Sequence, residues 1–190
     1  MCYNTFAMIH IVKDNAKAIH CPSKAVKMPL SKEDKSLLDE MLAYLENTQD
    51  PVYREKNPKV REGVGLAAPQ VGTNRRMLVI SYPTNEERTE FVKYELVNPK
   101  IVLSSIKKCY LIGGEGCLSV DTPHPGNVYR DYRVTVKAYN ALLGQDVTIK
   151  AQGYDAVVLQ HEIDHLDGIF FYDHIDPKNP EKELPGAIAI

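Results

Sequence analysis

The residues best suited to chemistry lie near the C-terminus, in the sequence QHEIDH at positions 160–165. If this stretch is helical, His161 and His165 lie about one turn apart on one face, where both imidazoles can bind the same metal ion. Glu162 lies off that face, close enough to act on a metal-bound water molecule without being a ligand. The pattern indicates a hydrolase that activates water at a metal ion. The alternative is a solvated helix that carries two histidines, so the other parts of a site must be sought elsewhere.

A catalytic metal site usually has three protein ligands and one open position, so a third ligand is expected. The H-x-x-G-x-x-H pattern of one metalloprotease group would place it at position 171, but this residue is Phe171, and His174 lies too far along. Cys117 is the best candidate, because a thiolate beside two imidazoles binds zinc and other first-row metals. The alternative for Cys117 is a buried free cysteine. Cys2, Cys21 and Cys109 are expected to be buried free cysteines of this kind.

Residues 63–72, GVGLAAPQVG, are mostly small, which allows other backbone to approach closely. Two nucleotide-binding interpretations fail for this stretch. No Lys-Ser or Lys-Thr pair follows it as in a P-loop, and Ala68 occupies the place of the third glycine in the dinucleotide-binding fingerprint.

The bulk properties fit a single domain over residues 1–190. A net charge of -2 gives no strong field toward nucleic acid or a membrane surface. The N-terminus lacks the basic region of a signal peptide, and no apolar run approaches the ~20 residues of a membrane span. Cysteines in such a chain are expected to be thiols rather than disulfides. These features predict a cytoplasmic protein.

The hydrophobic pattern predicts an α+β fold, with short antiparallel strands around a central metal-binding helix and one N-terminal helix. The N-terminal helix should begin at Ser31, which forms a capping-box-like start with Asp34. The metal-binding helix is expected over residues 154–166 and a surface loop over residues 51–62. Gly168 is expected to end that helix.

The apolar stripe of the first helix is Leu37, Leu38, Met41, Leu42 and Leu45. Strands are expected at residues 9–12, 77–82, 91–97, 100–106, 109–112, 132–139, 146–151 and 169–172, and residues 187–190 should pair with a sheet edge.

Three stretches together resemble the peptide deformylases. GVGLAAPQ at 63–70, EGCLS at 115–119 and QHEIDH at 160–165 occur in the order and approximate spacing of that family, and the resemblance covers the chain from the first helix onward. The charged loop before Gly63 and the lack of a C-terminal helix are similar to the longer second class of the family, found in Gram-positive bacteria and their relatives. One departure, Tyr129 before Arg130 where the family commonly has proline, concerns the rim of the pocket.

The resemblance implies removal of the N-formyl group from the N-terminal formylmethionine of newly made polypeptides, with release of formate. Cys117, His161 and His165 would then bind one divalent metal ion, physiologically Fe2+, for which Zn2+, Ni2+ or Co2+ can substitute. Glu162 would act as general base and then pass a proton to the leaving amine. The side-chain amide of Gln70 would donate a hydrogen bond to the oxyanion. The backbone N–H of Leu118 would be the second donor.

The resemblance also implies how the substrate binds. The backbone of Val64 and Gly65 would offer an edge to the extended peptide. Val157 and Val158, one turn before His161, would line a pocket for the methionine side chain, although the same residues could simply be core.

An ion pair between Glu115 and Arg130 would steady the loop that carries Cys117. The expected partners are N-formylmethionyl nascent peptides and, transiently, the ribosome. No membrane association and no direct nucleic-acid function are expected. Two other interpretations stay open: a metalloprotease with a ligand downstream of His165, and a structural metal site closed by a fourth protein ligand.

Overall fold

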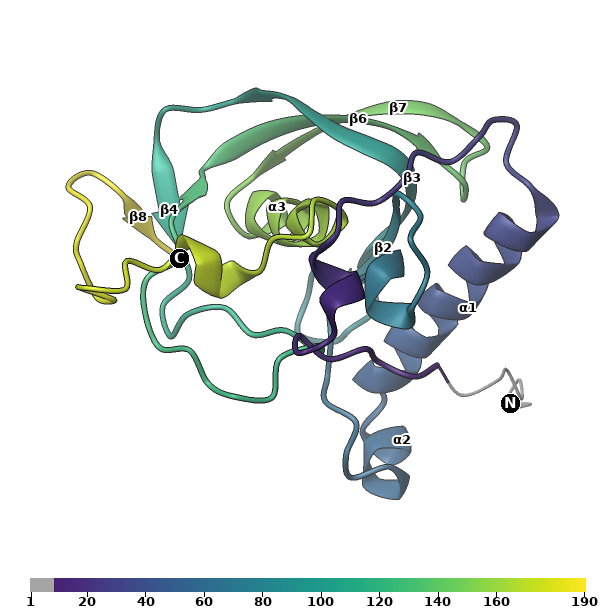
Figure 1. Ribbon diagram of the computed structural model, residues 1–190, viewed down its shortest axis with the longest axis horizontal. Helices are drawn as coiled ribbons and strands as arrows, with labels where there is room; N and C mark the ends of the chain where they lie inside the picture. Colours follow the sequence, from purple (N-terminus) through teal and green to yellow (C-terminus); the bar gives the residue numbers. More distant parts are fainter. Residues whose placement is uncertain (1–8) are drawn as a thin grey trace.

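The computed structural model describes residues 9–190, so Cys2 lies outside the described residues. Figure 1 shows α3 in the middle of the molecule, beneath an arch formed by β3, β6 and β7. The helices are α1 (Lys32–Gln49), α2 (Pro51–Lys56) and α3 (Tyr154–Leu166), and the 3-10 turns are η1 (Lys17–His20), η2 (Ala68–Val71) and η3 (Phe171–His174). The strands are β1 (Gly65–Ala67), β2 (Met77–Pro83), β3 (Phe91–Ser104), β4 (Lys108–Tyr110), β5 (Arg130–Asp131), β6 (Arg133–Asn140), β7 (Gln145–Gln152) and β8 (Ile188–Ala189).

The strands form two sheets. The larger has the order β1-β2-β3-β6-β7, and each neighbouring pair in it is antiparallel. The smaller has the order β5-β4-β8, in which the C-terminal strand β8 pairs with β4 in parallel. The α+β class is confirmed, as is the pairing of the C-terminal residues with a sheet edge.

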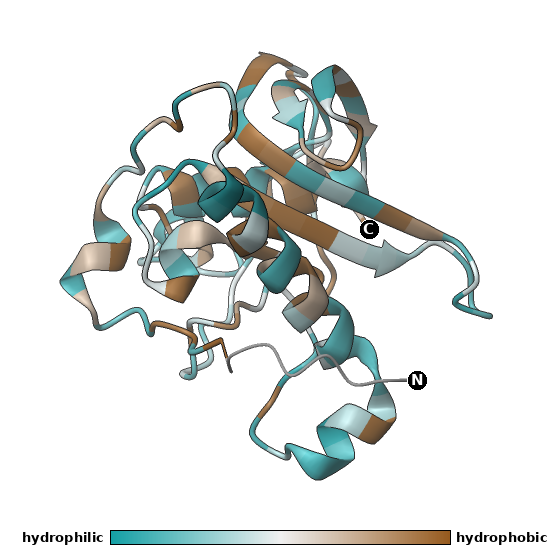
Figure 2. Cartoon of the chain, turned by 90° about the vertical axis from the view of Figure 1, so that its right-hand side faces the viewer, coloured by the Kyte–Doolittle hydropathy of each residue, from teal (hydrophilic) through white to brown (hydrophobic). Residues whose placement is uncertain are grey.

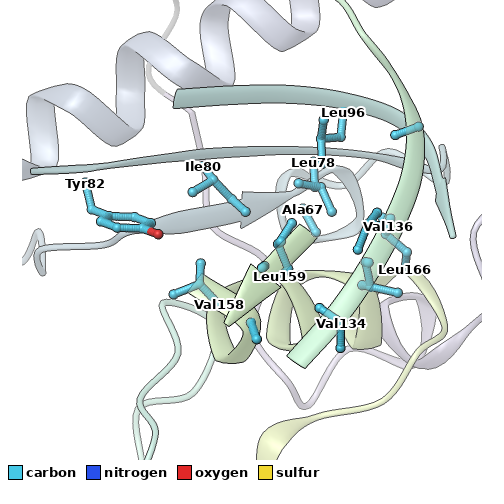
Figure 3. Close-up of a cluster of buried hydrophobic side chains, with 14 residues drawn as sticks. Ala67, Leu78, Ile80, Tyr82, Leu96, Val134, Val136, Val158, Leu159 and Leu166 are labelled. Atoms are coloured by element: carbon cyan, nitrogen blue, oxygen red, sulfur yellow. The ribbon is translucent and has the colours of Figure 1, made fainter. Parts of the chain in front are cut away.

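Strand β2 separates two hydrophobic clusters, because successive side chains of a strand point to opposite faces. Leu78 and Ile80 pack with α3, whereas Met77 and Val79 pack with α1. Figure 3 shows the α3 side of this arrangement. The labelled side chains there are Ala67, Leu78, Ile80, Tyr82, Leu96, Val134 and Val136 from the strands and Val158, Leu159 and Leu166 from α3. Helix α3 is thus fixed to the sheet along one face.

Helix α1 begins as expected. The Ser31 side chain accepts a hydrogen bond from the backbone N–H of Asp34 at 3.1 Å, which satisfies one of the unpaired donors of the first turn. Leu38, Met41 and Leu45 are fully buried against the sheet. Figure 2 shows this helix from outside, where hydrophilic residues predominate.

Part of the expected loop at residues 51–62 is helical, so that expectation is wrong. Helix α2 begins with Pro51, whose missing N–H is no loss at a first helical position. The Asp50 side chain accepts a hydrogen bond from Val52 N at 2.8 Å and caps the helix.

Three strand expectations also differ from the structure. Residues 91–97 and 100–106 were expected as separate strands, but β3 runs through both, with a register shift after Val97. Asn98 lies there at φ 52, and its side chain bonds to the backbone of Val26, which supports the irregular backbone. Residues 9–12 form no strand, and residues 169–172 lead into the turn η3, where Phe170 N donates to Asp173 at 2.8 Å. Cys21 is exposed rather than buried.

Candidate metal centre

Helix α3 places two imidazoles on one face. The rings of His161 and His165 are 4.9 Å apart between centroids and nearly perpendicular, with an interplanar angle of 80°. Cys117 approaches from the loop after β4, and its Sγ lies 3.1 Å from Nε2 of His165. The possible ligand atoms of these three residues all lie within 4.8 Å of one another. Ligands of a tetrahedral metal site are separated by roughly 3.5 Å, given metal–sulfur and metal–nitrogen bonds of about 2.3 and 2.0 Å. The cluster therefore fits one metal ion.

Glu115 orients the first of these histidines. Its Oε2 lies 2.7 Å from Nδ1 of His161, so a hydrogen on Nδ1 can donate to the carboxylate while Nε2 is the nitrogen that could bind a metal ion. Burial acts to raise the pKa of Glu115, but hydrogen bonds from His161 and Arg130 outweigh this and lower that pKa to about 2. The carboxyl group is therefore charged at neutral pH. Burial lowers the pKa of His165 well below its ordinary value, which favours the neutral imidazole, the form that can bind a metal ion.

Arg130 extends this network beyond the pair suggested by the sequence. Its Nε and Nη2 donate to both carboxylate oxygens of Glu115, at 2.8 and 3.0 Å. Its Nη1 bonds to Asp164 and lies 3.2 Å from Nε2 of His174. His174, considered above only as a metal ligand, instead lies 2.7 Å from Asp164. The sequence analysis assigned neither residue to this network. Asp164 could have been found from its place inside QHEIDH, whereas His174 lies outside the three motifs.

Glu162 lies on the cavity side of α3 and is buried, with 4% of its surface exposed. Its Oε2 has no hydrogen-bond partner among the described residues, and burial raises the pKa of this carboxyl to about 7. Gly65 faces the other oxygen so closely that an added Cβ would lie 2.2 Å from Oε1. A side chain at position 65 would therefore displace the carboxylate.

Gln70 is held between two segments. Its Oε1 accepts from Ala67 N at 2.8 Å, and its Nε2 lies 3.1 Å from Oγ of Ser119 and 3.4 Å from Sγ of Cys117. The extended residues near the N-terminus support both segments, since Val12 N donates to Gln70 O at 2.8 Å. The same extended stretch donates from Asp14 N to Ser119 O at 3.0 Å. These bonds explain why residues 9–12 form no strand: their backbone joins loops rather than a sheet.

A cavity of about 300 Å³ opens beside the cluster. Most residues that the sequence suggested for the site line it: Val64, Gly65, Gln70, Glu115, Cys117, Leu118, Val157, Val158, His161 and Glu162. His165 and Arg130 are buried and do not line the cavity. Val158 also belongs to the sheet core, so it serves as core and wall together.

Sequence reasoning missed other lining residues, namely Arg61, Glu62, Gly63, Leu111, Gly116 and Tyr154. The two glycines lie inside the GVGLAAPQ and EGCLS stretches, whereas the other four residues belong to no motif. Tyr129 does not line this cavity. Its hydroxyl donates to Lys182 O at 2.7 Å and accepts from Leu184 N at 2.9 Å, so it holds the C-terminal segment. Across residues 9–190, no helix has the length and apolar character to cross a membrane.

An α+β domain whose central helix and one cysteine form a three-ligand cluster beside a buried glutamate belongs to the class of metal-dependent hydrolases. Comparison with known proteins then narrows the class. The polypeptide deformylase family matches residues 8–181. The peptide deformylase of Macrococcus caseolyticus is 45% identical over 183 residues, covering 96% of this chain and 98% of that protein. Peptide deformylase 2 of Bacillus subtilis is 44% identical over 183 residues, covering 96% and 97%.

Solved structures agree. A crystal structure of the peptide deformylase of Ehrlichia chaffeensis in complex with actinonin has a TM-score of 0.74 and 33% identity, covering 91% of each chain. The chain belongs to the peptide deformylase family, whose members are metal-dependent enzymes that remove the N-formyl group from nascent peptides.

Proposed function

We propose that this chain removes the formyl group from N-terminal formylmethionine at a metal ion held by Cys117, His161 and His165. The observation that carries the proposal is the convergence of these three ligand groups, within 4.8 Å of one another, at a cavity that Glu162 also lines. The expected metal is Fe2+, and the same donor set suits Zn2+, Ni2+ and Co2+. When bound, the metal would acidify a water molecule and polarise the formyl oxygen.

Glu162 is proposed as the proton carrier. It takes the proton of the attacking water and delivers a proton to the amine that leaves. Its Oε2 is available for this because no side chain or backbone group within residues 9–190 bonds to it. The closeness of Gly65 and the burial of the carboxylate restrict it to the cavity side.

Gln70 and Leu118 are proposed to stabilise the oxyanion that develops on the formyl group. The Gln70 amide already points its Nε2 at the Cys117–Ser119 loop, and its Oε1 is fixed by Ala67 N. Loss of one such donor typically costs about 10²–10³-fold in rate.

The substrate is proposed to run along β1, the edge strand of the larger sheet. One side of β1 pairs with β2, and the backbone at Val64 and Gly65 lines the cavity, so an extended peptide can align there. Val157 and Val158 are the apolar wall offered to the methionine side chain. Glu115 and Arg130 keep His161 and the Cys117 loop in place.

The 190 residues are proposed to act as one catalytic domain. The proposed substrates are N-formylmethionyl nascent peptides in the cytoplasm, met during transient association with the ribosome. No membrane or nucleic-acid function is part of this proposal.

The test is formate release from formyl-Met-Ala-Ser by the purified wild-type protein and by Glu162→Gln, with the metal content of each measured. Release by the wild type alone, with metal in both proteins, supports the proposal. Unformylated Met-Ala-Ser and an internal peptide serve as controls. Cleavage of the internal peptide without formate release would replace the proposal by a protease, and metal with no hydrolysis at all would indicate a structural site.

A further inference from the structure

One guanidinium holds the loop that carries the cysteine ligand. Arg61 Nη2 donates to the backbone carbonyls of Cys117 and Leu118, each at 2.9 Å, and Arg61 Nη1 donates to the carbonyl of Val120 at 2.9 Å. Lys13 Nζ reaches the Leu118 carbonyl as well, at 3.0 Å. The carbonyls of this loop therefore face two cations.

The opposite face of the loop follows from peptide geometry. In a trans peptide unit the C=O and the following N–H point in opposite directions. Since the carbonyls of Cys117 and Leu118 point to Arg61, the N–H groups of Leu118 and Ser119 point away from it. The Ser119 N–H lies 3.4 Å from Sγ of Cys117, and the Leu118 N–H has no hydrogen-bond partner in residues 9–190. Leu118 lines the cavity, so an unused donor is available at the site.

We infer that Arg61 is a positioning residue for the deformylation reaction, which holds the Leu118 N–H toward the substrate oxyanion and the Ser119 N–H toward the cysteine sulfur. The inference rests on the proposed function. A cation at the carbonyl also polarises the peptide unit and strengthens its N–H as a donor. Arginine suits this task because its planar, rigid fork directs several donors along fixed directions, whereas the ammonium group of lysine is a compact charge on a flexible stem.

The segment that carries Arg61 is itself anchored. The next residue, Glu62, pairs with Arg54 of α2 at 2.9 Å and with Arg88 at 3.3 Å. Arg61 and Lys13 also share Asp121, at 3.2 and 2.8 Å. These contacts give α2 a part in the site: it fixes the place from which Arg61 reaches the loop.

The test compares Arg61→Met and Arg61→Lys with a matched control, Arg75→Met. Arg75 also pairs with a carboxylate, Asp34 at 2.7 Å, and both arginine side chains are 47% exposed, but Arg75 does not line the cavity. Three quantities are measured for proteins of equal metal content: kcat and KM for formate release from formyl-Met-Ala-Ser, and hydrogen exchange of the amides at residues 117–121.

Arg61→Met should lower kcat by about 10- to 100-fold with KM changed less than about twofold, because the donor is misdirected rather than removed. Exchange at residues 117–121 should become faster while exchange elsewhere is unchanged. Arg61→Lys should fall between Arg61→Met and wild type, and Arg75→Met should leave both readouts at wild-type values.

A raised KM with unchanged kcat would overturn the inference, since Arg61 would then contact the substrate. Wild-type kcat and exchange in both Arg61 variants would overturn it too, as would faster exchange throughout the protein. If the wild type releases no formate, the proposed function fails instead. The exchange at residues 117–121 then still reports whether Arg61 holds the loop.

Discussion

Two buried carboxylates lie beside the same histidine in opposite surroundings. Glu115 accepts hydrogen bonds from two nitrogens of Arg130 and lies 2.7 Å from His161 Nδ1. Glu162, the next residue along α3 from His161, has an oxygen without any partner in the described part of the chain. Burial raises the pKa of Glu162 to about 7, whereas the bonds from His161 and Arg130 outweigh burial at Glu115 and lower its pKa to about 2.

This difference distinguishes a carboxylate that supports the site from one that takes part in the reaction. A carboxylate with all its partners in place keeps its charge and can orient a neighbour, but it cannot readily take up a proton. A buried carboxylate without partners costs stability and is free to exchange a proton. The first arrangement suits the group that fixes a metal ligand, and the second suits a general base.

The largest effect is expected at Glu162. Glu162→Gln should reduce formate release by about 10²–10⁴-fold, because the amide cannot accept the proton of water. Its metal content should stay at the wild-type level, and its Tm should not fall, since a buried charge without a partner has been removed. Steady-state kinetics, metal analysis and thermal unfolding check these outcomes. Activity within a few-fold of wild type would assign the base elsewhere.

Gly65→Ala should act on the same carboxylate without changing it chemically. The new Cβ would lie 2.2 Å from Oε1 of Glu162, so the side chain must move, and a shift of about 1 Å can cost about 10²-fold in rate. Gly116→Ala is the matched control, because an added Cβ there meets nothing within 4 Å. Gly116→Ala should keep the wild-type rate, and a wild-type rate in Gly65→Ala as well would show that the position of Glu162 is not critical.

Glu115→Gln should weaken metal binding rather than proton transfer. The variant loses the charge that orients His161, a change that typically costs about 10- to 100-fold in metal affinity. Competition with a chelator measures the affinity, and kcat at saturating metal measures the chemistry. A large loss of kcat at full metal occupancy would contradict the division of roles between the two carboxylates.

The smallest effect is expected at Tyr129, beside the Arg130 network. Tyr129→Phe removes the hydroxyl bonds to Lys182 O and Leu184 N, for a loss of about 1 kcal/mol in stability. Metal affinity and kcat should be unchanged. Unchanged values would show that the hydrogen-bond network that supports Glu115 does not depend on Tyr129. Denaturant unfolding and chelator competition test this, and a drop in metal affinity would extend the support to the C-terminal segment.

Much of the fold could be predicted because the signals are local. Helix α1 has its cap at Ser31, α3 begins after Gly153 and ends before Gly168, and the β6–β7 hairpin shows period-two alternation. Helix α2 was missed because charge and proline content outweighed the Asp50-Pro51 start signal. The bulge in β3 was missed because Asn98-Pro99 is typical of a turn, and only the bonds from Asn98 to Val26 show why the strand continues.

The sequence by itself determined the spacing of His161 and His165, the acid between them and, through three motifs in order, the family. Only the tertiary structure decided that Cys117, 48 residues before His165, comes within 3.1 Å of it. The same is true of the hydrogen bonds that Arg61 donates to the backbone of the loop that carries Cys117. The physical reason is the separation in sequence between the residues that interact. Helical periodicity is set within a few residues, whereas contacts across the chain depend on how the sheet, α3 and the loops pack together.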